Sequence, residues 1–284
     1  MSKDQAEMDQ LMLNLAEKYL LALDHVDKGM VSAYHAPIES RPKTLSRICF
    51  ILCASLKKKQ KHEHVFQQTI GRLNKLTRVL CDFDPLKIIE KYQKGDWEKM
   101  VEAVQLEVMF EKEPNPSEQS VIPQFCKGVL SAAYFFHQFH KAQDFYEWVD
   151  AFKQDEKARL DLPTLLSQEV HGLGFALATD FLKEIGYNGF GKPDAKTKAI
   201  FSELGLIPTG EDTEQDAATF EAIARMARNT GRTAYEVDKI FWLLGTGYFY
   251  KHGITMASPK NGFVAAALEV LGQEQESPGP GEIG

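Results

Sequence analysis

The stretch from Val170 to Phe201 constrains the fold more than any other part of the sequence, because it predicts a tight turn between two helices. Gly172 and Gly174 flank one apolar residue, and two glycines so close together let the backbone turn where side chains would clash. Residues 175–185 then repeat apolar side chains at helical spacing. The sequence therefore predicts a helix, a hairpin and a second helix.

An acidic loop follows this second helix. Gly186 is the expected end of the helix, and a short Gly-rich loop, 188–191, leads into Lys192, Pro193 and Asp194. Aspartate is a favoured N-cap, so Asp194 is expected to cap a helix that begins at the next residue.

The order of these motifs resembles the helix-hairpin-helix DNA glycosylase superfamily, which includes endonuclease III and the alkyladenine-type glycosylases. That family has a Gly-x-Gly hairpin, a helix, and a loop that ends in an essential aspartate. Here Gly172, Leu173 and Gly174 match the hairpin, and Asp194 follows Gly172 by 22 positions. The resemblance is carried by residues 160–205 and implies an all-α, two-lobed fold.

The sequence departs from the family pattern at two positions. His171 stands where the family usually has proline, and Ala176 stands where its bifunctional members carry a lysine. The Cys-rich C-terminal loop that holds the iron–sulfur cluster of endonuclease III has no counterpart. The resemblance therefore implies a monofunctional enzyme without an iron–sulfur cluster, and we expect no cofactor and no metal.

The composition is that of a globular protein. The chain has 284 residues, of which 44% are hydrophobic, enough for one or two domains. Its polar, acidic N-terminus is unlike a signal peptide, and no apolar run has the length of a membrane span. The four cysteines are expected to be reduced, buried thiols, although two of them share a helix face and could form a metal pair: Cys49, Cys53, Cys81 and Cys126.

The charge is distributed unevenly along the chain. The net charge of −7 argues against general affinity for nucleic acid, but residues 41–79 contain ten Lys or Arg and one acidic residue, Glu63. One basic face on an acidic protein is what we expect of a groove binder with little non-specific affinity. The alternative is that the lysines at 57–61 form a solvated helix end.

Apolar periodicity predicts helices throughout and no strands. We expect helices at residues 9–24, 45–56, 65–80, 85–92, 97–111, 123–150, 175–185, 195–204, 219–230, 233–250 and 262–271, with a further helix start at Leu162 and Pro163. Residues 245–247, Gly-Thr-Gly, are expected to end or bend the helix 233–250. Residues 273–284 are rich in Gly, Pro and Glu and are expected to be disordered. The predicted fold class is all-α.

The resemblance also implies the arrangement of the two lobes. A helical bundle ending in the hairpin corresponds to residues 44–191. The second lobe joins residues 1–43 to residues 192–272. Asp194 is then expected at the junction of the lobes.

Several residues are candidates for binding DNA. Backbone N–H groups from Gly172 to Phe175, at a helix N-terminus, can point at one phosphate. By position, the loop 56–62 would fill the hole left by a flipped base. The candidate DNA-binding residues are Gly172, Leu173, Gly174, Phe175, Lys192, Lys196, Lys198, Lys57, Lys58 and Lys59.

A flipped base also needs an apolar or aromatic pocket. The candidates lie in the aromatic-rich segment before the hairpin: Tyr134, Phe136, His137, His140 and Trp148. Most aromatic residues at helical spacing belong to a core, so one or two of the five are expected to line a pocket. His137 and His140 also resemble a metal pair, but a structural role is favoured.

Asp194 is the candidate catalytic residue. Breaking an N-glycosidic bond leaves positive charge on the sugar, which an ionised carboxylate stabilises while it orients or deprotonates water. The expected partner is double-stranded DNA and the expected state a monomer away from membranes, in the cytoplasm or, in a eukaryote, the nucleus. Two alternatives remain: a DNA-binding module without chemistry, and a helical protein-interaction domain whose Gly-x-Gly is accidental.

Overall fold

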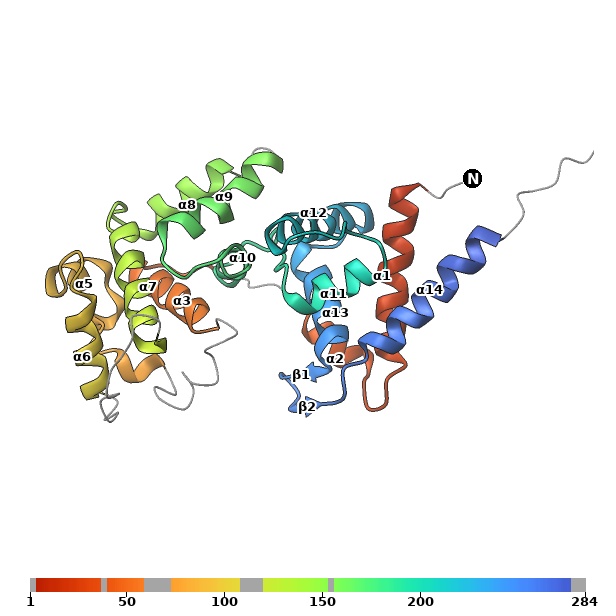
Figure 1. Ribbon diagram of the computed structural model, residues 1–284, viewed down its shortest axis with the longest axis horizontal. Coiled ribbons are helices and arrows are strands. Elements are labelled where there is room, and N and C mark those ends of the chain that lie inside the picture. The colour runs from red at the N-terminus through yellow and green to blue at the C-terminus, as the bar shows by residue number, and fades with distance from the viewer. Residues whose placement is uncertain (1–3, 37–39, 59–72, 108–119, 153–155, 277–284) are drawn as a thin grey trace, which may run out of the picture. The chain divides into compact units, whose positions relative to one another are not determined.

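The computed structural model describes residues 4–36, 40–58, 73–107, 120–152 and 156–276. It is predominantly helical, with a single two-stranded hairpin among these residues, so the all-α prediction is confirmed (Figure 1). None of the described helices combines the length and hydropathy needed to cross a membrane.

The chain forms two compact units. The middle unit comprises residues 40–186, and the terminal unit joins residues 1–39 to residues 187–284. The sequence analysis placed the corresponding boundaries at 43/44 and 191/192. The loop 187–191 belongs to the terminal unit because Tyr187 and Phe190 are buried there, and because the Tyr235 N–H donates to the Asn188 carbonyl at 3.0 Å.

The middle unit is built around α7 (Val121–Phe136), which packs against α3, α5 and α6. The other elements are α3 (Leu45–Lys57), two short 3-10 turns (Leu73–Leu76 and Cys81–Phe83), α5 (Pro85–Lys91), α6 (Trp97–Glu107), α8 (Ala142–Ala151), α9 (Glu156–Glu169) and α10 (Phe175–Glu184). Helix α10 packs on α9 and α3. The hairpin between α9 and α10 is therefore held against the body of this unit.

The terminal unit brings the two ends of the chain into one core. Its elements are α1 (Gln5–Leu21), α2 (Lys28–Ala33), α11 (Ala195–Glu203), α12 (Asp212–Thr230), α13 (Ala234–Thr246), β1 (Tyr248–Phe249), β2 (Ile254–Thr255) and α14 (Lys260–Glu276). Helix α1 packs along α12 and α13, and α11 also packs on α13. The strands are antiparallel, with Tyr248 opposite Thr255.

Side-chain caps explain where several helices begin. Asp84 caps α5, where its Oδ1 accepts from the N–H groups of Leu86 and Lys87, and Pro85 fills the first helical position. Thr233 and Glu236 form a reciprocal capping box at the start of α13.

The predicted continuous helix at 123–150 is wrong, because the chain forms α7 and α8 with a break between them. The Phe139 N–H donates to the Phe136 carbonyl at 3.0 Å, which ends the regular helical pattern of α7. The Asp144 side chain then accepts from the N–H groups of His140 and Lys141, which starts α8. Local capping thus overrides the continuous apolar pattern.

The C-terminal region agrees with its prediction in one place and differs in another. Helix α13 ends at Thr246, within the segment 245–247 expected to end or bend it, because Gly247 adopts a φ of +66° and the chain turns into the β-hairpin. Helix α14 runs to Glu276, so the first four residues of the segment predicted to be disordered are helical. These four residues are glutamine and glutamate, which favour helices. The Gly/Pro-rich residues 277–284, which dominated the prediction of disorder, lie outside the described part of the chain.

Two further helix predictions are corrected. In the predicted helix 65–80, the first eight residues lie outside the described residues, and Leu73–Leu76 forms a 3-10 turn. Helix α9 begins at Glu156 rather than Leu162, and Pro163 lies inside it. The prediction of buried thiols is confirmed for Cys49, Cys53 and Cys126, and the described cysteines are not joined in disulfides.

Candidate functional site

The glycine hairpin has the sharp turn that its sequence predicted. Gly172 adopts a φ of +78°, a conformation that side chains disfavour. The Leu173 N–H donates to the Val170 carbonyl at 3.1 Å, and the Leu173 side chain is buried, which fixes the hairpin to the middle unit. Gly174 has an ordinary φ of −68° and is the N-cap of α10.

Helix α7 holds the start of the hairpin. The His171 N–H donates to Ser131 Oγ at 2.8 Å, and the His171 ring lies 2.9 Å from Gln124 Oε1. Gly128 allows a close approach, because a Cβ added there would lie 2.9 Å from the His171 carbonyl oxygen. The hairpin is thus attached to a neighbouring helix by side-chain and backbone contacts.

The first turn of α10 has no side-chain cap. Within the described part of the chain, no acceptor takes the N–H groups of Gly172, Gly174 and Ala176. A Cβ added at Gly174 would meet no atom within 4 Å, so a side chain has room at this position. Open N–H groups at a helix N-terminus favour an anion.

Three described residues of the basic segment, Arg41, Lys58 and Arg78, are engaged in ion pairs. Lys58 Nζ lies 2.9 Å from Asp180 Oδ2 and 3.8 Å from Glu184 Oε1, both on α10. Burial alone would lower the pKa of Lys58, but these two carboxylates raise it above its ordinary value. Lys57 is the last residue of α3 and is half-buried, and Lys59 lies outside the described residues.

Asp194 caps α11 through one of its two oxygens. Its Oδ1 accepts from the N–H of Lys196 at 2.9 Å and from the N–H of Thr197 at 3.0 Å. Oδ2 makes no hydrogen bond to the residues that the structure describes. One oxygen is therefore structural, and the other remains available for chemistry.

The loop before Asp194 is firmly packed in the terminal unit. Phe190 is buried and contacts the Phe220 ring, with 5.8 Å between the ring centroids. Gly191 is required by a close approach, since a Cβ there would lie 2.5 Å from the Ile223 side chain. This packing fixes the backbone that carries the Asp194 carboxylate, so no flexible side chain is needed to position it.

The surroundings of Asp194 raise its pKa above the ordinary value. Burial raises the pKa of its carboxyl, and the nearby charge of Asp238 on α13 raises it further. The two cap bonds and Lys192 act in the opposite direction but do not offset these effects. Only 9% of Asp194 and 1% of Asp238 are exposed, so the two acids form a buried pair of like charge.

The three lysines predicted near Asp194 differ in their environments. Lys192 is half-buried, and Lys196 is exposed. Lys198 forms ion pairs with Asp216 at 2.8 Å and Asp212 at 3.2 Å. Lys198 is therefore already neutralised by carboxylates in the terminal unit.

The five candidate base-pocket residues are dispersed within the middle unit. Phe136 is fully buried in the core, and Trp148 packs within the aromatic cluster around Phe145, with centroids 5.8 Å apart. His137 is the C-cap of α7, and His140 is exposed where α8 begins. Tyr134, in contrast, lines a cavity.

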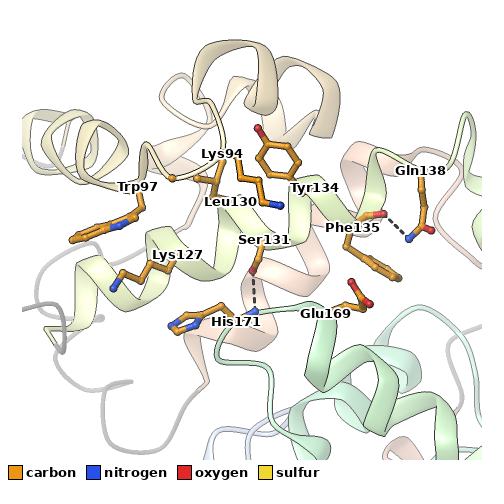
Figure 2. Close-up of a pocket in the computed structure, with 11 residues that line it drawn as sticks. Lys94, Trp97, Lys127, Leu130, Ser131, Tyr134, Phe135, Gln138, Glu169 and His171 are labelled. Atoms are coloured by element: carbon orange, nitrogen blue, oxygen red, sulfur yellow. Dashed lines mark hydrogen bonds between the residues drawn. The ribbon is translucent and has the colours of Figure 1, made fainter.

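This cavity, the α7 pocket, has a volume of about 520 Å³ and reaches the first residues of the hairpin (Figure 2). Its walls are formed by the loop before α6, one face of α7 and the end of α9. They comprise Lys94, Gly95, Trp97, Lys127, Leu130, Ser131, Tyr134, Phe135, Gln138, Glu169 and His171.

The sequence analysis did not identify Asp238, Ser131 or the lysines of the α7 pocket. Asp238 carried a signal, because an acidic residue stands there between the apolar Val237 and Ile240 of a helix. Ser131 and Lys127 carried none, since their roles depend on contacts with segments distant in sequence. Among the described residues, no cluster of three or more His, Cys, Asp or Glu side chains could hold a metal ion.

Comparisons with protein-family models, with curated proteins and with solved structures gave no significant match.

Proposed function

We propose that the chain is a DNA glycosylase that removes a modified or damaged base by hydrolysing its N-glycosidic bond. The observation that carries this proposal is the divided role of Asp194. Its Oδ1 caps α11, while Oδ2 makes no bond to the described residues. A carboxylate that is fixed through one oxygen and open at the other suits the stabilisation of a developing positive charge.

The hairpin would hold the DNA. Its open N–H groups at the start of α10 suit a backbone phosphate, a contact that anchors the strand without reading its sequence. The target base would be rotated out of the duplex at a cost of a few kcal/mol. Asp194 would then stabilise the sugar cation and orient the attacking water.

Water, rather than a lysine, would be the nucleophile. Ala176 occupies the position at which the bifunctional members of the resembled family carry a lysine. Lys183 on the same helix is 2% exposed and lies 3.4 Å from Asp180, which leaves it inaccessible to a sugar. The expected product is an intact strand with an abasic site.

The test is a screen of duplexes that each contain one modified base, with abasic sites as the readout. Release of one base by the wild type and its loss in Asp194→Asn would support the proposal. Borohydride trapping during turnover tests the nucleophile, because a covalent adduct that forms as fast as the base is released requires an amine. Such an adduct would exclude the water mechanism.

A second candidate function is DNA binding without catalysis, which the open hairpin supports independently of Asp194. It predicts salt-dependent binding to all duplexes, since phosphate contacts release counterions, and no base release from any of them. A protein-interaction domain would show neither property.

A further inference from the structure

The α7 pocket combines two kinds of side chain, aromatic rings and cations. Trp97 and Tyr134 contribute half-buried aromatic rings, and Lys94 and Lys127 contribute positive charge. Lys127 Nζ lies 4.3 Å from the centroid of the Trp97 ring, so charge and ring are already in contact. A planar ring that carries an anion would satisfy both.

The opposite end of the pocket differs in character. Figure 2 shows Trp97 and Lys127 toward one end, Gln138 and Glu169 toward the other, and Lys94 in between. Glu169 is exposed and can accept hydrogen bonds from N–H or NH₂ groups of a ligand. The cavity thus provides rings, cations and an acceptor in sequence along its length.

We propose that the α7 pocket binds one nucleotide, with its phosphate at Lys94 and Lys127, its base against Tyr134, and the edge of the base toward Glu169. The volume of about 520 Å³ lies within the range of small-ligand sites. Guanine suits the acceptor end, because its N1–H and 2-amino group both donate to a carboxylate. Deoxyguanosine monophosphate is therefore the probe of choice.

The position of the pocket indicates the source of the nucleotide. His171 lines the pocket and immediately precedes Gly172, while its N–H is held by Ser131, another lining residue. A strand whose phosphate is bound at the hairpin therefore passes the mouth of the pocket. An unpaired nucleotide of that strand is the expected occupant. This choice of source rests on the proposed function, whereas the binding of a free nucleotide by the pocket does not rest on it.

Calorimetric titration with deoxyguanosine monophosphate tests the pocket directly. The wild type is expected to bind it at one site, and Tyr134→Ala to weaken binding by about 5- to 150-fold, the range for loss of base stacking. Lys127→Met is expected to weaken binding too, while Lys99→Met, which changes an exposed lysine of α6 that is paired with Asp96 and does not line the pocket, is the matched control. Tyr134→Phe should retain most of the affinity.

Two smaller probes separate the parts of the ligand. Deoxyribose 5-phosphate lacks the base and deoxyguanosine lacks the phosphate, so each is expected to bind more weakly than the nucleotide. No binding of the nucleotide, equal binding of deoxyribose 5-phosphate, or an unchanged affinity in Tyr134→Ala would overturn the proposal. None of these outcomes involves base excision, so the proposed function would stand or fall separately.

A single-stranded oligonucleotide tests the source. If the occupant belongs to the strand at the hairpin, Tyr134→Ala and Gly174→Val each weaken binding of the oligonucleotide, whereas Gly174→Val leaves binding of the free nucleotide unchanged. If Gly174→Val has no effect on the oligonucleotide, the occupant is a free nucleotide and the strand assignment is wrong.

Discussion

Two helices in this protein begin in opposite ways. Helix α10 starts at Gly174, which offers no side-chain acceptor, and the N–H groups of Gly174 and Ala176 have no acceptor among the described residues. Helix α11 starts at Asp194, whose own Oδ1 accepts two of the N–H groups. Both ends have the same partial positive charge from the aligned peptide dipoles.

The difference shows how one kind of local structure serves two purposes. An uncapped end leaves its donors for an anion from outside, such as a phosphate. At a capped end the same donors bind one oxygen of a carboxylate of the protein itself. The second oxygen of that carboxylate then stays available for another role. Substitutions at the two helix starts should therefore affect different properties, DNA affinity at α10 and catalysis at α11.

The largest effect is expected for Asp194→Asn. The amide oxygen can still cap α11, but the negative charge is lost, so base release should slow by about 10²- to 10⁴-fold at unchanged DNA affinity. Single-turnover base release and equilibrium binding measure the two quantities. Asp84→Asn is the matched control, because Asp84 caps α5 through Oδ1 in the same way. An equal loss in both variants would make the role of Asp194 structural.

The next largest effect is expected for Gly174→Val. Valine fits the φ of −68° and the open space around Gly174, so the fold is retained, but the side chain blocks the approach of a phosphate. Hydrogen bonds to a charged group contribute about 1.5–3 kcal/mol each. The loss of one such bond should therefore lower the affinity for every duplex by at least about tenfold. Binding isotherms at several salt concentrations measure this loss.

Gly272→Val in α14 is the control for this substitution, because a Cβ there also meets no atom within 4 Å. Its DNA affinity should equal that of the wild type. Normal binding by a folded Gly174→Val variant would show that the phosphate lies elsewhere. Gly172 is a poorer test site, since its φ of +78° makes any substitution strained.

The stability of the α11 cap should depend on pH. The pKa of Asp194 is raised in the folded state by burial and by Asp238, so its protonated form is favoured there. This contribution is complete below the ordinary pKa of 3.8 and is lost as the pH rises through the raised value. Wild type should therefore lose stability relative to Asp194→Asn as the pH increases across this window.

Urea unfolding at a series of pH values measures this difference, and Asp194→Ala provides the cap-free reference. Alanine cannot accept from the two N–H groups, so it should be about 1 kcal/mol less stable than asparagine at every pH. A wild type that gains stability over Asp194→Asn with rising pH would contradict the raised pKa.

The smallest effect is expected for two lysines near the capped end. Lys192 is half-buried and lies close enough to Asp194 to lower the pKa of the Asp194 carboxyl. Lys192→Met should therefore weaken DNA binding a few-fold and reduce the slope of log affinity against log salt concentration by about 0.9. Lys198→Met should leave that slope unchanged, because Lys198 is paired with Asp212 and Asp216. The reverse result would place the phosphate at Lys198.

The sequence predicted the hairpin and the Asp194 cap because both depend on residues close together in the chain. A glycine at a positive φ and an aspartate at a helix start have local causes. The break between α7 and α8 was missed because the capping bonds of Asp144 compete with an apolar pattern that continues through it.

The tertiary parts of the candidate site could not be predicted from sequence. The contact from His171 to Ser131 spans 40 residues, and the ion pair of Lys58 with Asp180 spans 122. Nothing near Lys58 or Lys198 in the chain indicates that carboxylates neutralise them. The charge count of the basic segment therefore overstated how much positive charge is available to DNA.

The division of the chain also sets an order for its synthesis. Helix α1 leaves the ribosome before its packing partners α12 and α13, which lie beyond the entire middle unit, residues 40–186. At about 5–20 residues per second, translation of those 147 residues takes roughly 7–30 s. Throughout that time Met12, Leu13 and Leu20, all buried in the finished protein, have no core to enter. The nascent chain must therefore carry an exposed apolar helix while the middle unit folds.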